Sequence, residues 1–149
     1  MTKLEYKIGN LLDVTKGHIV HGCNAQGVMG SGVAKAIKEK YPEVFKGYRQ
    51  QYEDTGLMLG DACGYVVADG LVVWNAITQK NYGDPTSTRY VSYDAIAECF
   101  EIINRDVAVI EKMLNVEPHI HIPLIGAGLG GGKWEIIEKI IEEIKEDGE

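Results

Sequence analysis

The stretch HIPLIGAGLGGG, residues 121–132, decides the fold of this chain. Residues 119–123 form a short apolar run that suits a buried strand, and a helical pattern begins at about Lys133 or Trp134. The glycines between them permit positive φ and let the backbone approach a ligand closely. Successive N–H groups in such a turn converge on an anion, and the helix dipole adds partial positive charge. The stretch therefore predicts a phosphate-binding loop between a strand and a helix.

A second segment of the same design lies nearer the N-terminus. The apolar run at residues 18–23 leads through a glycine cluster at residues 27–32 into a helical stretch that begins near Val33. Either loop alone fits a flexible connector as well as a binding site. Two such loops at strand-to-helix junctions of one small domain favour phosphate binding. Neither has the residue order of a P-loop or of a dinucleotide-binding fingerprint.

The rest of the chain alternates between predicted strands and helices. Strands are predicted at residues 4–8, 63–67 and 71–77, and the last two meet at the hairpin signal Asp69-Gly70. Helices are predicted after Pro42 and over residues 96–114, where apolar residues follow a 3.6-residue period. This pattern predicts one α/β domain over residues 1–149, with a mixed, largely parallel sheet covered on both faces. Ligands bind such folds beyond the carboxyl ends of the strands.

Composition limits the function. The 149 residues are 45% hydrophobic and 25% charged, which fits one ordinary globular domain. The net charge of −7 argues against a general nucleic-acid binder, although loop N–H groups can still hold a small anion. The N-terminus turns polar at once and no apolar run approaches the roughly 20 residues of a membrane span, so a cytoplasmic location is expected. The widely spaced Cys23, Cys63 and Cys99 predict neither a disulfide framework nor a metal site, and no cofactor is expected.

Three motifs together resemble the macrodomain, the ADP-ribose-binding module. The resemblance covers nearly the whole chain and implies a three-layer α/β/α sandwich with a mixed central sheet, in which ADP-ribose lies in a cleft along the crest. The positions that match the family motifs are Gly9, Asn10 and Leu11; Asn24, Ala25, Met29, Gly30, Ser31, Gly32, Val33 and Ala34; and Ile125, Gly126, Ala127, Gly128, Leu129, Gly130 and Gly131.

The resemblance also implies a role for each motif. The segment at residues 9–11 is expected to face the adenine, where macrodomains commonly carry an aspartate in place of Asn10. The carbonyl oxygen of Asn10 can still accept a hydrogen bond from the adenine amino group. Asn24 matches the asparagine that contacts the distal ribose. The two glycine-rich segments match the loops that enclose the diphosphate and the distal ribose.

Within the family, residues 21–27 are most similar to the ADP-ribose 1''-phosphate phosphatase branch, which carries a histidine three residues before the ribose asparagine. This similarity implies a metal-independent phosphatase that forms ADP-ribose and phosphate, with His21 and Asn24 organising water and substrate. A histidine with an ordinary pKa of about 6.5 can activate a water or protonate a leaving oxygen. The alternative interpretation of His21 is a buried strand histidine that is hydrogen-bonded within the core.

Other activities share the same pocket. One is a non-catalytic reader of ADP-ribose, free or attached to protein, and another is a hydrolase that releases ADP-ribose from a modified macromolecule. A related macrodomain branch removes ADP-ribose from protein glutamate with a lysine late in a central strand and an aspartate in the second glycine loop. The nearest positions here are Gln79 and Gly130, which cannot do that chemistry, although Lys80 is one residue from the expected lysine. Because nothing acidic lies in the loop, the sequence disfavours that branch.

Two further segments have open interpretations. The alternating His119 and His121 suggest a metal pair, but we expect no carboxylate to complete it. Residues 81–90 form either a solvated connector or a wall of the cleft. In the second case Tyr82 would stack on the ligand and Asp84 would act as an acid or base.

Overall fold

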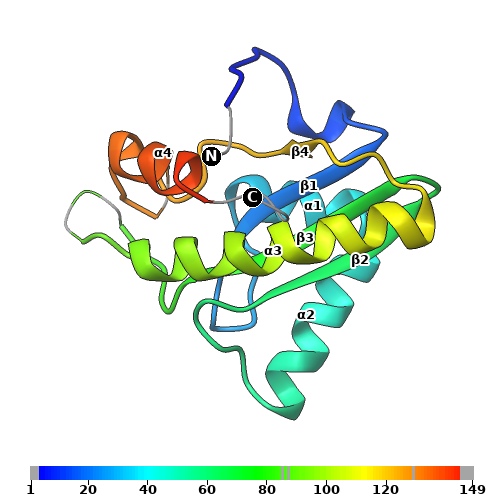
Figure 1. Cartoon of the computed structure of the whole chain (residues 1–149). Coiled ribbons are helices and arrows are strands. Elements are labelled where there is room, and N and C mark those ends of the chain that lie inside the picture. Colours follow the sequence, from blue (N-terminus) through cyan, green and yellow to red (C-terminus); the bar gives the residue numbers. More distant parts are fainter. Residues whose placement is uncertain (1–3, 85, 87, 129, 145–149) are drawn as a thin grey trace.

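A central sheet orders the chain in the computed structural model, which describes residues 4–84, 86, 88–128 and 130–144. The described strands are β1 (Gly17–Asn24), β2 (Ala62–Ala68), β3 (Leu71–Gln79) and β4 (Ile120–His121). They lie in the order β2-β3-β1-β4, with β1 parallel to both β3 and β4 and β2 antiparallel to β3. Figure 1 shows this sheet behind a long helix that crosses it.

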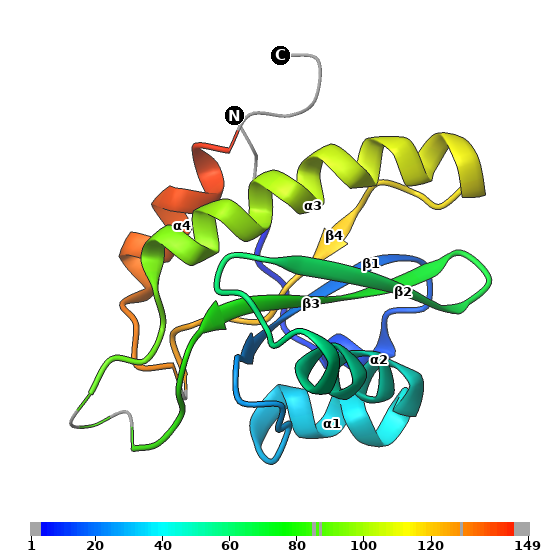
Figure 2. The same cartoon turned by 90° about the horizontal axis from the view of Figure 1, so that it is seen from below.

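Helices cover both faces of the sheet. The helical elements are η1 (Leu11–Asp13), α1 (Gly32–Lys40), α2 (Pro42–Asp54), α3 (Tyr93–Leu114) and α4 (Trp134–Glu142). Figure 2 shows α1 and α2 on one side of the sheet and α3 and α4 on the other. The mixed α/β/α sandwich predicted from the sequence is therefore confirmed. None of the described helices is both long enough and apolar enough to span a bilayer.

Local signals explain where the two longest helices begin and end. Pro42 opens α2, at a position where its missing N–H has no intrahelical partner to lose. The Ser92 hydroxyl caps α3 by accepting a hydrogen bond from the backbone N–H of Ala95 at 3.1 Å. Asn115 ends α3 in the left-handed conformation, with φ of 52°.

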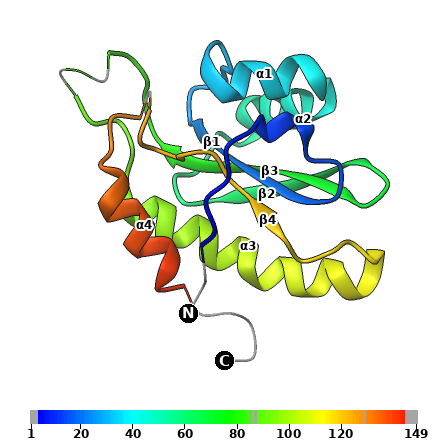
Figure 3. The ribbon, with the colours of Figure 1, turned by 90° about the horizontal axis from the view of Figure 1, so that it is seen from above.

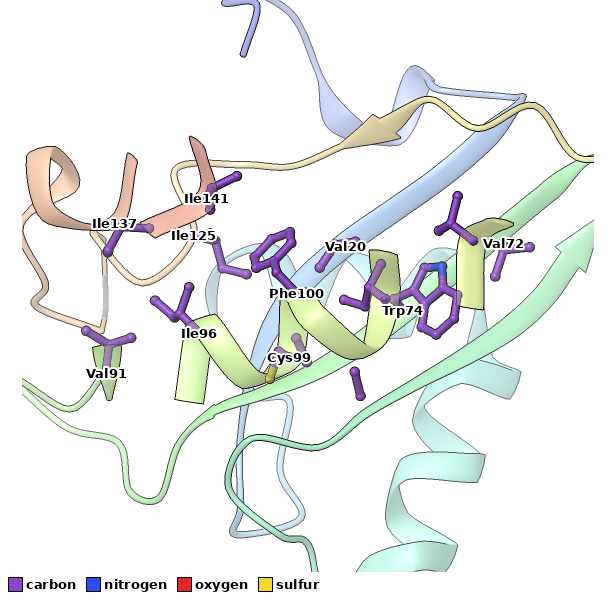
Figure 4. Packing of buried hydrophobic residues seen from close by; sticks show 14 of the residues in the cluster. Val20, Val72, Trp74, Val91, Ile96, Cys99, Phe100, Ile125, Ile137 and Ile141 are labelled. Carbon is purple, nitrogen blue, oxygen red and sulfur yellow. The ribbon is translucent and has the colours of Figure 1, made fainter. Parts of the chain in front are cut away.

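Strand alternation divides β1 between two cores. Val20 packs beneath α3 and α4, in the cluster that Figure 4 shows around Phe100. Ile19 packs beneath α1 and α2 with Ile37 and Val44. Successive side chains of a strand point to opposite faces, so His21 and Cys23 lie on the same side as Ile19.

The two predicted strands at the β4 edge are corrected. Residues 4–8 form no strand, and none of the described strands pairs with them; instead Tyr6 packs edge-on against Trp134, whose Nε1 donates to the Tyr6 hydroxyl at 2.9 Å. The predicted strand at residues 119–123 is only the two residues of β4. Pro123 has no N–H to continue a ladder, which limits extension in that direction.

Candidate functional site

Three loops gather at one end of the sheet. The first glycine loop (residues 25–31) follows β1, the β3–α3 loop (residues 80–92) follows β3, and the second glycine loop (residues 124–132) follows β4. Figure 3 shows them at the same end of the molecule. The parallel pairing of β1 with β3 places Asn24 opposite Gln79, so both residues lie at the junction of the loops. This is the carboxyl end of the parallel strands, where α/β sheets bind ligands.

Side chains hold the first glycine loop. The Asn24 Oδ1 accepts from the backbone N–H of Gln26 at 2.9 Å, and its Nδ2 donates to the carbonyl of Val28 at 3.1 Å. The Tyr48 hydroxyl lies 2.6 Å from the Asn24 carbonyl and 2.8 Å from its Oδ1. Asn24 therefore orders the loop, and only its second Nδ2 hydrogen remains for a ligand. Sequence reasoning missed Tyr48, because nothing in α2 marks it as a partner of β1.

The end of the first glycine loop offers backbone groups to solvent. Gly30, Ser31 and Gly32 are exposed, and an added Cβ at Gly30 would meet nothing within 4 Å. The Ser31 side chain makes no capping hydrogen bond, so the first N–H groups of α1 stay open to an anion. Met29 differs from its neighbours, because its side chain is buried against Cys23 and only its backbone can reach a ligand.

The second glycine loop is closed by its own backbone. The N–H of Gly132 donates to the carbonyl of Gly126 at 2.8 Å, and that of Gly131 donates to Gly128 at 3.1 Å. Gly126 and Gly131 have φ of 78° and 71°, a conformation that favours glycine. Ile125 anchors the loop in the core, and Leu129 lies outside the described residues.

Two glycines of this loop have opposite surroundings. An added Cβ at Gly128 would meet nothing within 4 Å. At Gly130 it would lie 2.8 Å from the Gly126 carbonyl oxygen and 3.0 Å from the Gln79 Oε1. The loop therefore faces open space at Gly128, whereas Gly130 is packed and has no room for the aspartate of the related hydrolase branch.

The β3–α3 loop is hydrogen-bonded at both of its ends. The Gly130 carbonyl accepts from the N–H groups of both Tyr90 and Val91, at 2.8 and 3.0 Å. At its other end, the Lys80 carbonyl accepts from the N–H of Ala25 at 3.2 Å and from the Gln26 side chain at 3.0 Å. The loop is thus bonded to both glycine loops. It leaves Lys80 exposed directly after the end of β3.

The predicted adenine segment lies elsewhere. The Asn10 Oδ1 caps η1 by accepting from the N–H of Leu12 at 2.9 Å, and Gly9 is exposed. Leu11 packs against the cluster under α1, and the Lys40 ammonium at the end of α1 donates to the Leu12 carbonyl. Because α1 begins at the first glycine loop, this segment lies beside its far end. The adenine contact through Asn10 remains a prediction.

His21 is not in the cleft, which corrects the expectation that it acts on substrate. Its side chain has 0% exposure, and its Nε2 lies 2.6 Å from the Oδ1 of Asn75 on the adjacent strand. Asn75 in turn donates to the Val44 carbonyl of α2 at 3.2 Å. Burial lowers the pKa of His21 to about 4, although the Asn75 hydrogen bond raises it in part. His21 is therefore a neutral core residue, as the alternative interpretation had it.

The remaining candidates lie apart from the loops. His119 Nδ1 lies 3.2 Å from a Glu117 carboxylate oxygen, a neighbour that the sequence analysis overlooked. Among the described residues, no group of three histidine, cysteine or acidic side chains is placed to hold a metal ion. Burial raises the pKa values of the Cys23, Cys63 and Cys99 thiols, which are all free.

Comparison with known proteins assigns the family. The Macro domain family matches residues 20–141, so the chain belongs to the macrodomains, a family of ADP-ribose-binding modules. The chain is 28% identical, over 91% of its length, to the DNA ADP-ribosyl glycohydrolase of Mycobacterium tuberculosis, and the match spans 37% of that protein. It is 23% identical, over 96% of its length, to the ADP-ribose 1''-phosphate phosphatase of Candida glabrata, with 93% of that protein covered.

A solved structure agrees with this assignment. The macrodomain of Mycobacterium tuberculosis DarG superposes with a TM-score of 0.72 and 28% identity, covering 90% of this chain and 84% of that one. The chain thus spans little more than a third of the mycobacterial glycohydrolase it matches, and the shared part is the macrodomain. Relatives with two different hydrolase names thus align with this one domain.

Proposed function

We propose that this macrodomain is an ADP-ribosyl hydrolase that releases ADP-ribose from a modified nucleic acid. The observation that carries the proposal is the placement of Lys80, which is exposed at the carboxyl end of β3 while its carbonyl is held by the first glycine loop. The enclosed ring of His21 offers no equivalent group. The DNA ADP-ribosyl glycohydrolases that align with most of this chain support a nucleic-acid substrate.

The two glycine loops supply the binding energy in this proposal. Open space at Gly30 and Gly128 admits the diphosphate close to the backbone. The N–H groups at the start of α1 and in the second loop then face negative charge, without any surplus of basic side chains. The distal ribose then lies near Asn24, and the second Nδ2 hydrogen of Asn24 donates to a ribose hydroxyl oxygen.

The reaction is hydrolysis of the bond between C1'' of the distal ribose and the nucleic acid. Water adds to C1'', the bond to the leaving atom breaks, and a proton passes to the leaving atom. The Lys80 ammonium, a compact donor on a flexible stem, supplies hydrogen bonding and positive charge at that leaving atom. This assignment places the lysine one position after Gln79, the residue that aligns with the lysine of the related branch.

The test is release of ADP-ribose from an ADP-ribosylated single-stranded oligonucleotide. The parent protein should release it, and Lys80→Ala should lower the rate by roughly 100-fold, the smaller end of the range for lost acid–base groups. Lys112→Ala, on the exposed last turn of α3, is the matched control and should keep the parent rate. No release by the parent overturns the hydrolase proposal, and equal rates in Lys80→Ala remove that residue from the mechanism.

A second candidate function is that of an ADP-ribose 1''-phosphate phosphatase. The Candida glabrata relative supports it, because the alignment covers nearly the whole of both chains. The loop N–H groups would stabilise the phosphoryl oxygens. Incubation with ADP-ribose 1''-phosphate and a metal chelator should then release phosphate from the parent and equally from His21→Gln. Absence of phosphate contradicts this candidate. Tight binding of ADP-ribose without turnover of either substrate would identify a reader.

A further inference from the structure

Two cations meet at the outer rim of the second glycine loop. The Arg89 guanidinium carbon lies 4.3 Å from the centre of the Tyr93 ring, and the backbone N–H of Lys133 donates to the Tyr93 hydroxyl at 3.0 Å. Arg89 and Lys133 therefore both lie beside Tyr93, and the Lys133 N–H and the positive charge of Arg89 lower the pKa of Tyr93. We call Arg89 and Lys133 the rim pair.

The rim pair is built into the site but lies outside the two glycine loops. Arg89 precedes Tyr90, whose N–H binds the Gly130 carbonyl, and Lys133 directly follows Gly132. Both side chains are exposed, and neither forms an ion pair with a carboxylate of the described residues. In a chain with a net charge of −7, this is a local concentration of positive charge beside the ligand cleft.

The chemistry of the rim pair suits a phosphate group. A guanidinium binds two phosphate oxygens at once, and an ammonium adds a point charge. A diphosphate held by the loop N–H groups does not need these side chains, which leaves them for a second anion. On the same β3–α3 loop, Tyr82 is 59% exposed, and exposed aromatic rings among cations are typical of surfaces that bind single strands.

We propose that the rim pair binds a backbone phosphate of the nucleic-acid strand that carries the ADP-ribose, with Tyr82 stacking on a neighbouring base. The proposal rests on the proposed function for the identity of the strand. It explains how an acidic protein accepts a polyanionic substrate: the favourable contacts are confined to the mouth of the cleft. The net charge then disfavours binding to unmodified nucleic acid elsewhere on the surface.

The test measures binding rather than turnover, in a Lys80→Ala background that keeps the substrate intact. The probes are ADP-ribose, ADP-ribose 1''-phosphate and an ADP-ribosylated single-stranded oligonucleotide. Adding Arg89→Ala and Lys133→Ala should weaken oligonucleotide binding by about tenfold. It should also reduce the slope of log affinity against log salt by roughly 0.7, the value for one lost single-strand phosphate contact. Affinity for ADP-ribose should not change.

Control variants and contrary outcomes complete the test. Arg105→Ala removes an exposed α3 arginine that pairs with Asp106, and it should leave all three affinities unchanged. An equal loss of ADP-ribose affinity in the rim-pair variant overturns the proposal, because the pair would then belong to the diphosphate site. A loss confined to ADP-ribose 1''-phosphate also overturns it, as does an unchanged salt slope. Failure of the parent to release ADP-ribose affects only the hydrolase proposal, since these affinities do not depend on cleavage.

Discussion

The two glycine loops are built on opposite principles. The first glycine loop is held by side chains from outside it: Tyr48 fixes Asn24, and Arg49 donates to the Gly27 carbonyl at 3.2 Å. The second glycine loop is held by its own backbone, through bonds such as Gly132 to Gly126, and by the absence of side chains where it packs. Removing side-chain contacts should therefore loosen the first loop, whereas adding a side chain at a packed glycine should disrupt the second.

The largest expected effect concerns the strand beneath the first glycine loop. The folded state keeps His21 neutral down to a pKa of about 4, while the unfolded chain takes up a proton below its ordinary pKa of 6.5. Stability therefore falls as pH drops from 6.5 to 4, by roughly 3 kcal/mol from this residue. Urea unfolding of the parent and of His21→Gln at pH 7 and pH 4 measures it.

The replacement should make the decline smaller by that amount without changing turnover at pH 7. His18, whose pKa burial also lowers to about 4, still contributes in the variant, so the profile flattens only in part. Parallel profiles for the two proteins would contradict a neutral, enclosed His21. A large loss of turnover at pH 7 with unchanged stability would return it to the mechanism.

Adding a side chain to the second glycine loop should have the next largest effect. In Gly132→Val the new Cβ would lie 2.6 Å from the Val91 Cγ1 and 2.8 Å from the Gly126 carbonyl oxygen. Overpacking of this kind costs about 2–3 kcal/mol of unfolding free energy, which chemical denaturation will show. The Val91 neighbour offers a matched check, because Val91→Ala in the same chain should recover part of the loss. No recovery would contradict the stated clash.

Deleting the Tyr48 hydroxyl should loosen the first glycine loop by a smaller amount. Tyr48→Phe leaves the Asn24 carbonyl and Oδ1 without this donor, at a cost of about 1–2 kcal/mol in stability. Because Asn24 is then held only by its bonds to Gln26 and Val28, ADP-ribose affinity measured by calorimetry should also fall. Tyr52→Phe, on the same helix and beside Gly27, is the control and should change neither quantity. If Tyr48→Phe changes neither stability nor ADP-ribose affinity, side chains do not hold the first glycine loop, and the stated difference between the two loops is wrong.

The smallest stability effect is expected at the open face of the second glycine loop. Gly128→Val meets nothing within 4 Å and needs no positive φ, so the unfolding free energy should change by less than about 0.5 kcal/mol. Calorimetry should nevertheless detect no ADP-ribose binding, because the new side chain occupies the space of the diphosphate. Unchanged affinity would show that the ligand lies elsewhere.

The sequence predicted the elements better than it predicted the directions of side chains. An apolar run located β1, and the Asp69-Gly70 signal located the β2–β3 hairpin. Pro42 and the 3.6-residue period located helices, and clustered glycines located both loops. The orientation of His21 was not available from the same data. Alternation along β1 shows that neighbours point to opposite faces, but it does not show which face opens toward the cleft.

Contacts between distant segments were equally out of reach. Tyr48 contacts Asn24 because α2 packs on the sheet near the carboxyl end of β1. That placement depends on tertiary packing rather than on any local sequence signal. Residues 4–8 have the composition of a strand, yet in the described chain they lie beside α4 and pair with no strand. The sequence shows a glycine at position 130, where the related hydrolase branch has an aspartate. Only the structure shows that no side chain fits at this position.

The contact between Tyr6 and Trp134 has an optical consequence. The chain has two tryptophans: Trp74 is 3% exposed in the core and donates to His18, and Trp134 begins α4 two residues after the second glycine loop. A Trp74→Phe protein would carry its indole fluorescence beside the second glycine loop, and a Trp134→Phe protein would carry it in the interior. Fluorescence of the Trp74→Phe protein would thus report ligand binding, and fluorescence of the Trp134→Phe protein would report global unfolding.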